Sequence, residues 1–271
     1  MRKYDNEKEV EVIIDNYTNK KWGLLKSGAQ FGMSKSKTKR ILTDNGVKIR
    51  TNSEAQRKYS LNEKYFDVES HNMAYILGLF AADGTIRKDS NEIKITLSSI
   101  DKEILEKIQL EIGSSRPLRE FTTEKGYQNT TLDFCSERMK LKLAEYGVVP
   151  NKTTNLIPPI KLNPLFIPDY IRGYFDGDGC ITTTGYLNHG IEWKIVSASK
   201  EILDYFENYF FEQFGVPKIH IHWRKKEKNK LQLYDLRYST NFSKQLYDIL
   251  YTPNALFLQR KKERYEQLIM K

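Results

Sequence analysis

The sequence has few cysteines and no long apolar run. Only Cys135 and Cys180 occur in 271 residues, neither lies in a CxxC pair, and the four histidines lack zinc-ligand spacing. A disulfide framework is therefore not expected, and a reducing, cytoplasmic compartment is the default, with bacterial, phage and organellar hosts not distinguished. No apolar stretch approaches the roughly 18 residues that span a bilayer, and the N-terminus lacks a signal-peptide core, so no membrane association is expected.

Positive charge is what the sequence has in excess. Its 44 lysines and arginines against 35 acidic residues give a net charge of +9, while 39% hydrophobic content is typical of a globular chain. A basic excess of this size favours polyanionic partners, chiefly nucleic acid. The alternative is that the surplus charge only solvates a surface, and composition does not decide between the two.

Residues 1–50 are expected to form a small helix-turn-helix domain. A first amphipathic helix is predicted by apolar residues at i, i+3, i+4 and i+7, which are Val10, Ile13, Ile14 and Tyr17. A second, short helix is predicted over about 21–30, and its inward residues are expected to be Trp22, Leu25 and Ala29. Short helices joined by tight turns are typical of this class of DNA-binding unit.

A third helix is predicted after the turn at Gly32, with Ser34 as its N-cap and Gly46 as its stop. In a helix-turn-helix this last helix enters the major groove. One face of the predicted helix is basic, which favours DNA contact, although a basic face is also compatible with simple solvation. The DNA-binding candidates on this face are Lys35, Lys37, Lys39 and Arg40.

Residues 51–69 are polar and weakly periodic, and they are interpreted as a linker. The rest of the chain contains an internal repeat. "AYILGLFAADGTI" (74–86) matches "DYIRGYFDGDGCI" (169–181) in its Tyr, Ile, Gly, Asp-Gly and closing Ile. Later segments also correspond, with 98–113 matching 197–215 and 141–153 matching 246–262. The predicted organisation is therefore a helical domain at 1–50, a linker at 51–69, and two repeats at 70–168 and 169–271.

Each repeat contains strand-like alternation with one polar face. In 92–98 the outward side includes Lys94 and Thr96. In 218–224 the residues expected to point inward are Ile219, Ile221 and Trp223, and those expected outward are Lys218, His220, His222 and Arg224. A sheet with one apolar face and one basic, hydrogen-bonding face suits a surface that reads a DNA groove, whereas an ordinary half-exposed sheet is the alternative.

The two matching helices each carry a glycine at the middle and an aspartate five residues later. A glycine on an apolar helix face costs about 1 kcal/mol relative to alanine, so a packing reason is expected. If the helices touch through Gly78 and Gly173, Asp83 and Asp178 emerge together at one end. Two adjacent carboxylates repel unless a cation lies between them, and Mg²⁺ accepts a few carboxylates plus phosphate oxygens and water. The pattern therefore suits metal-assisted phosphodiester hydrolysis.

The motifs "ILGLFAADG" (76–84) and "IRGYFDGDG" (171–179) resemble the two signature motifs of the LAGLIDADG homing endonucleases. The resemblance, over residues 70–271, implies an α+β monomer of two pseudo-symmetric αββαββα halves. The motif helices form the interface between these halves, and saddle-shaped antiparallel sheets straddle a long, nearly asymmetric double-stranded DNA site. It also implies that both strands are cut, leaving short 3′ overhangs, and that no protein partner is required.

The resemblance also implies site residues. The last acid of each motif is the catalytic, metal-binding one in the family, which maps to Asp83 and Asp178. A basic residue late in each repeat lies near the scissile phosphate, and Lys152 and Lys261 match these positions, the latter being hard to separate from its basic neighbours Arg260 and Lys262. The first acid, usually structural, is Asp176 in the second motif and is replaced by Ala81 in the first, so the halves are unequal.

The function expected from residues and resemblance together is site-specific, Mg²⁺-dependent cleavage of double-stranded DNA in intron homing. Mn²⁺ is expected to substitute for Mg²⁺, and Ca²⁺ is expected to bind without supporting cleavage. Two alternatives remain open: a DNA-binding transcriptional regulator on an inactive endonuclease fold, and an intron RNA maturase. The ends Met1-Arg2 and Met270-Lys271 lack splicing residues, which favours a free-standing enzyme over an intein.

Overall fold

The computed structural model describes the chain as two compact units, residues 1–59 and 60–271. Within them the described residues are 7–50, 54, 58–184, 190–219, 221–223, 231–253 and 255–270. Most of the segment 51–57 of the expected linker lies outside these residues. In the described part of the chain, no helix is both long and apolar enough to cross a membrane.

The described part of the first unit contains three short helices around a small apolar core. They are α1 (Glu7–Thr18), α2 (Leu24–Ala29) and α3 (Lys35–Asp44), and Ser34 caps α3 by accepting a hydrogen bond from the Lys37 amide. The core is formed by Ile13, Tyr17, Ile41 and Leu42. The helical N-terminal region expected from the sequence is therefore present.

The inward face of α2 differs from the expectation. Leu25 and Ala29 are exposed, and the buried residues of this helix are Ser27 and Gly28. A Cβ at Gly28 would lie 2.2 Å from the Thr38 hydroxyl oxygen, so α3 approaches the backbone of α2 directly. Small residues permit this approach, and the larger Leu25 points to solvent, which apolar periodicity alone does not predict.

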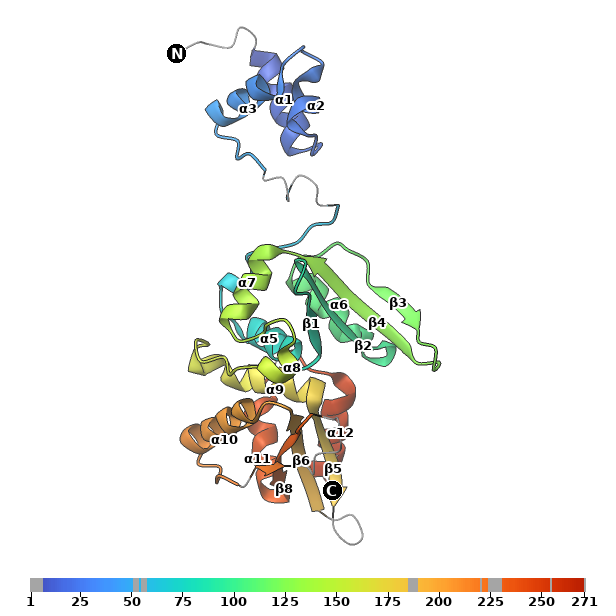
Figure 1. Ribbon diagram of the computed structural model, residues 1–271, viewed down its shortest axis with the longest axis vertical. Helices are drawn as coiled ribbons and strands as arrows, with labels where there is room; N and C mark the ends of the chain where they lie inside the picture. The colour runs from blue at the N-terminus through green and yellow to red at the C-terminus, as the bar shows by residue number, and fades with distance from the viewer. Residues whose placement is uncertain are drawn as a thin grey trace. The chain divides into compact units, whose positions relative to one another are not determined.

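The second unit consists of two halves with the same order of elements (Figure 1). The first half is α5 (His71–Asp83), β1 (Gly84–Ile86), β2 (Glu92–Ser98), α6 (Lys102–Glu111), β3 (Arg119–Thr122), β4 (Gln128–Cys135), α7 (Glu137–Glu145) and α8 (Lys152–Asn155). The second half is α9 (Ile167–Asp178), β5 (Gly179–Thr184), β6 (Gly190–Ser197), α10 (Lys200–Phe214), β7 (His222–Trp223), β8 (Tyr234–Ser239), α11 (Thr240–Leu250) and α12 (Gln259–Ile269). The expected pair of αββαββα halves is confirmed.

Among the described residues, each half has a four-stranded antiparallel sheet, with order β1-β2-β4-β3 in the first and β5-β6-β8-β7 in the second. The register is equivalent, since Lys94 of β2 pairs with Asp133 of β4 and Lys194 of β6 pairs with Arg237 of β8. The apolar faces are buried and the other faces are polar. Figure 1 shows α5 and α9 side by side between the two sheets.

One hydrophobic core spans both halves. Every residue of α5 from Met73 to Ala82 is buried, because the helix is covered by α9 and by its own sheet. This explains why "MAYILGLFAA" is apolar all round instead of amphipathic. In the second half the Phe175 ring stacks on Trp193 with centroids 5.0 Å apart. The motif helices are therefore held rigidly from both sides.

Residues 60–69, which sequence reasoning placed in the linker, belong to this unit. A short 3₁₀ turn at Tyr65–Asp67 buries Phe66 completely in the core. Arg138 of α7 pairs with Asp67 and so ties this segment to the first half. A single aromatic residue in a polar stretch gives no periodic signal, which is why the pattern did not predict this packing.

Candidate active site

The candidate site begins where the motif helices cross. A Cβ at Gly78 would lie 2.0 Å from the carbonyl oxygen of Tyr170, and a Cβ at Gly173 would lie 2.0 Å from that of Tyr75. The two backbones therefore touch at equivalent points of the two halves. Because both helices run from this crossing to the same end of the interface, their last residues, Asp83 and Asp178, reach one location.

The two carboxylates interact with each other. A Cβ at Gly177 would lie 3.0 Å from Oδ2 of Asp83, so the Asp83 carboxylate lies against the last turn of α9. Asp178 is accessible to solvent, but the surrounding protein displaces part of its water. This desolvation, followed by the charge of Asp83, raises the pKa of Asp178 to about 6. Desolvation also raises the pKa of Asp83.

A lysine from the end of each half approaches the motif helix of that half. Lys152 donates to the carbonyl oxygen of Ala82, next to Asp83. Nζ of Lys261 donates to three carbonyl oxygens at the end of α9: Phe175 at 2.8 Å, Gly177 at 3.2 Å and Gly179 at 2.7 Å. Cations suit these positions because the last carbonyls of a helix carry partial negative charge.

Both lysines are electrically coupled to both acids. Desolvation lowers the pKa of Lys152 and of Lys261, and the charges of Asp83 and Asp178 oppose that shift. In turn, both lysines oppose the rise in the pKa of each acid. The site is therefore a cluster of two carboxylates and two ammonium groups with approximate twofold symmetry.

The structure separates Lys261 from its basic neighbours. Arg260 binds both carboxylate oxygens of Asp101, at 2.8 Å through Nη and at 2.8 and 3.0 Å through Nε. Lys262 pairs with Glu266 at 3.4 Å. Of the three, Lys261 is the residue whose side chain reaches the end of a motif helix.

Asp176 has a different environment from Asp178. It is buried and accepts hydrogen bonds from the Tyr75 hydroxyl at 2.8 Å and the Leu258 amide at 2.7 Å. Desolvation raises its pKa to about 6. Asp176 thus connects α9, α5 and the segment before α12. At the matching position Ala81 is buried among apolar groups.

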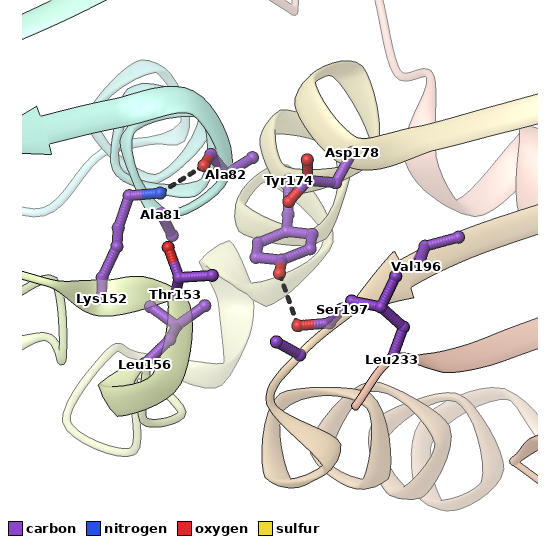
Figure 2. Close-up of a pocket in the computed structure, with 11 residues that line it drawn as sticks. Ala81, Ala82, Lys152, Thr153, Leu156, Tyr174, Asp178, Val196, Ser197 and Leu233 are labelled. Atoms are coloured by element: carbon purple, nitrogen blue, oxygen red, sulfur yellow. Dashed lines mark hydrogen bonds between the residues drawn. The ribbon is translucent and has the colours of Figure 1, made fainter. Parts of the chain in front are cut away.

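A cavity of about 290 Å³ opens beside Asp178 (Figure 2). Its walls include Ala82 and Lys152 from the first half and Tyr174 and Ser197 from the second. The Tyr174 hydroxyl lies 3.0 Å from the Ser197 hydroxyl, as the dashed line in Figure 2 shows. Sequence reasoning did not include Tyr174 and Ser197, because their meeting depends on how β6 lies against α9.

The expected DNA-binding side chains are distributed over three surfaces. The four basic candidates on α3 are all exposed. Lys94 and Thr96 lie on the polar face of the first sheet, where the Thr96 hydroxyl contacts that of Thr131 at 2.7 Å. Lys218 and His222 are exposed in the second half. His220 and Arg224 lie outside the described residues.

One inward assignment within the predicted strand 218–224 is wrong. Trp223 is 64% exposed, and His222 beside it is also exposed. The strand is only two residues long and lies at the edge of its sheet, so strict alternation does not extend through the predicted range of 218–224. Ile221, also expected to point inward, is buried.

Comparison with known proteins identifies the family. The profile of the LAGLIDADG-like domain matches residues 70–146 and 166–250, which is more than half of the chain and includes both motif helices. The chain therefore belongs to the LAGLIDADG-like domain family. An uncharacterised protein of Methanocaldococcus jannaschii is 24% identical over 186 residues, covering 66% of this chain and 67% of that protein.

Solved structures with similarity to the chain include different kinds of LAGLIDADG protein. The N-terminal LAGLIDADG domain of WhiA has a TM-score of 0.45 at 15% identity, covering 80% of this chain and 98% of that one. The homing endonuclease I-GzeII in complex with its DNA target has a TM-score of 0.47 at 11% identity, covering 74% and 90%. The homing endonuclease I-LtrWI bound to target DNA has a TM-score of 0.44 at 11% identity, covering 77% and 90%.

Proposed function

We propose that this protein is a site-specific endonuclease that cuts both strands of DNA by a divalent-metal mechanism, leaving short 3′ overhangs. The observation that carries the proposal is the joint position of Asp83 and Asp178 at the end of the two glycine-packed helices. A fold that served only to bind DNA would not need two acids side by side, both with a raised pKa, at a surface meant for a polyanion. Their retention is explained if a cation and a phosphate meet there.

The donor set fits Mg²⁺. Asp83 and Asp178 supply hard oxygen ligands, and a cation between them would remove their mutual repulsion. Within the described residues, no cluster of three or more His, Cys, Asp or Glu side chains gathers to hold a metal. Mg²⁺ usually takes one or two carboxylates and completes its shell with phosphate oxygens and water, so two acids are enough. Mn²⁺ should replace it, whereas Ca²⁺ should support binding alone.

Asp83 and Asp178 would hold the Mg²⁺, which when bound would lower the pKa of a water and offset charge on the leaving oxygen. The chain itself supplies position and charge around the phosphate. The two acids are held by the rigid crossing of α5 and α9, and Lys152 and Lys261 place ammonium groups beside them. These lysines would stabilise the negative charge that develops on the phosphoryl oxygens.

The direct test is cleavage of a plasmid library that carries randomised inserts. In the presence of Mg²⁺, we expect linear molecules whose ends share one sequence and carry 3′ overhangs. With Ca²⁺ we expect a retarded complex and intact DNA. Specific binding without cutting in either Mg²⁺ or Mn²⁺ would instead identify a regulator. Preferential binding of structured intron RNA, with accelerated splicing, would identify a maturase.

Replacing Lys261 by methionine should slow cleavage about 100-fold, the effect expected on losing one group that stabilises transition-state charge. DNA affinity should change only a few-fold, because one buried contact contributes little to the total phosphate attraction. Single-turnover rates and binding curves measure the two quantities separately. The matched control is Lys262→Met, which removes the neighbouring lysine paired with Glu266 and should retain the wild-type rate. Equal loss in both variants would contradict the role of Lys261.

The basic face of α3 is proposed to bind DNA phosphates or base edges. Lys39→Gln should reduce the slope of log K against log salt by about 1, as expected for the loss of one phosphate contact. Fluorescence anisotropy over a salt series measures that slope. Lys8→Gln removes an exposed charge from α1 and serves as the control, with an unchanged slope. Identical slopes for all three proteins would show that α3 does not contact the backbone through Lys39.

A further inference from the structure

The polar face of the first sheet contains a buried carboxylate. Asp133 of β4 lies on the side opposite the apolar Leu132 and Phe134, yet its side chain is only 2% exposed. Two arginines cover it: Nη of Arg116 lies 2.7 Å from one carboxylate oxygen, and Nε of Arg119 lies 2.8 Å from the other. A buried carboxylate is stable only when cations or hydrogen-bond donors compensate its charge, and here the two arginines do so. We therefore infer that the role of Asp133 is to hold these two cations.

The guanidinium of Arg119 is held in one orientation and is also accessible to a ligand. It belongs to β3, the edge strand of the sheet, in which all four residues are exposed. Its side chain is 57% exposed, and the bond to Asp133 occupies Nε. Within the described part of the chain, the two Nη groups are thus left for a ligand. A guanidinium held in this way loses little conformational entropy when it binds.

These properties match one DNA base. Guanine presents O6 and N7 as two acceptors in the major groove, and a bidentate arginine is their commonest specific partner. β3 is the exposed edge strand of its sheet and pairs with β4, and an antiparallel strand pair can present side chains to that groove. Phosphate contact alone would not require an arginine fixed by a buried aspartate, because a mobile lysine serves equally well.

The second sheet has a different residue at the position that matches Asp133. Opposite Lys194 stands Arg237, where the first sheet has Asp133 opposite Lys94. Arg237 is held by Asp235 of its own strand at 2.5 Å. Both sheets therefore contain an arginine fixed by a buried aspartate, but at positions that are not related by the twofold symmetry. Arg119 has no arginine counterpart at the symmetry-related position, so the base pair that depends on Arg119 should lie in one half-site only.

We propose that Arg119, oriented by Asp133, reads a guanine in the DNA half-site contacted by the first repeat. The inference rests on the proposed DNA-binding function and adds a specificity-determining residue to it. Asp133 acts as a positioning residue, since it contacts Arg119 and not the base.

The test is selection from a randomised duplex DNA library, with Ca²⁺ replacing Mg²⁺ so that bound DNA stays intact. Wild type should enrich a sequence with a strongly preferred guanine in one half. Arg119→Lys should lose roughly 10- to 100-fold of the preference for that guanine and keep the other positions, because lysine retains the charge but not the bidentate geometry. The matched control is Arg138→Lys, which should leave the preference for that guanine unchanged. Arg138 lies on helix α7, its side chain has a similar exposure (52%), and it is paired with Asp67.

Asp133→Asn provides a second variant with an independent outcome. It should weaken the preference at the same base pair, and a thermal melt will show whether the fold is retained. An Arg119→Lys consensus identical to wild type, or a loss spread evenly over all positions, would overturn the inference and leave the endonuclease proposal intact. A wild-type protein that enriches no sequence would overturn both.

Discussion

Asp178→Asn should give a protein that binds its DNA target normally and cuts it at least about 1,000-fold more slowly. Removing one member of a catalytic unit commonly costs three orders of magnitude or more. Asparagine keeps the size of the side chain but loses the negative charge that Mg²⁺ requires, so the metal site is lost while the helix end is kept. Single-turnover cleavage of the selected target measures the loss, and gel shifts with Ca²⁺ measure the binding.

The double variant Asp83→Asn, Asp178→Asn is the decisive form of this experiment, since two acids share the site. It should show no cutting above background. The control is Asp89→Asn, which changes an exposed acid in the loop between β1 and β2 and should cut at the wild-type rate. Undiminished cleavage by the double variant would refute the assignment of both residues.

Gly173→Ala should lower the free energy of unfolding by about 3 kcal/mol or more. Helix propensity predicts the opposite sign, because alanine is favoured over glycine by about 1 kcal/mol in a helix interior. The steric term outweighs it, since the new methyl group would lie 2.0 Å from the Tyr75 carbonyl oxygen and the helices would have to separate. Urea denaturation followed by tryptophan fluorescence, with Trp193 buried in the same core, measures the change.

Gly78→Ala should behave in the same way, because its methyl group would meet the Tyr170 carbonyl oxygen at an equal distance. Gly23→Ala is the control, with no heavy atom within 4 Å of the added carbon, and should change stability by no more than about 1 kcal/mol. If Gly173→Ala were as stable as wild type, the two helices would not cross as closely as described.

Much of the second unit followed from the sequence, because its signals are local or repeated. The matching motifs predicted two equivalent halves, and the unusual glycines on apolar helices predicted a close helix contact. The same reasoning failed where the signal was one residue wide. A periodic pattern needs several apolar residues in one element, and three positions lack them. They are Phe66 in a polar stretch, Leu25 on a six-residue helix and Trp223 on a two-residue strand.

Contacts between side chains that are distant in the sequence were the hardest feature to predict. Arg119 and Asp133 meet because of the register of β3 on β4, and Lys261 is distinguished from Arg260 only by the direction in which each leaves the start of α12. Neither fact can be read from spacing along the chain. The structure places Lys152 and Lys261 at the ends of the two motif helices, and their catalytic role stays a prediction.

The ion pair between Arg260 and Asp101 bears on whether the two halves could be produced as separate polypeptides. Asp101 lies in the first half and is 5% exposed as a side chain, whereas Arg260 lies in the second. A polypeptide ending before residue 169 would leave that carboxylate without its guanidinium and expose the glycine-marked face of α5 to water. The two halves therefore stabilise each other, and we expect any split version of the protein to need both fragments together.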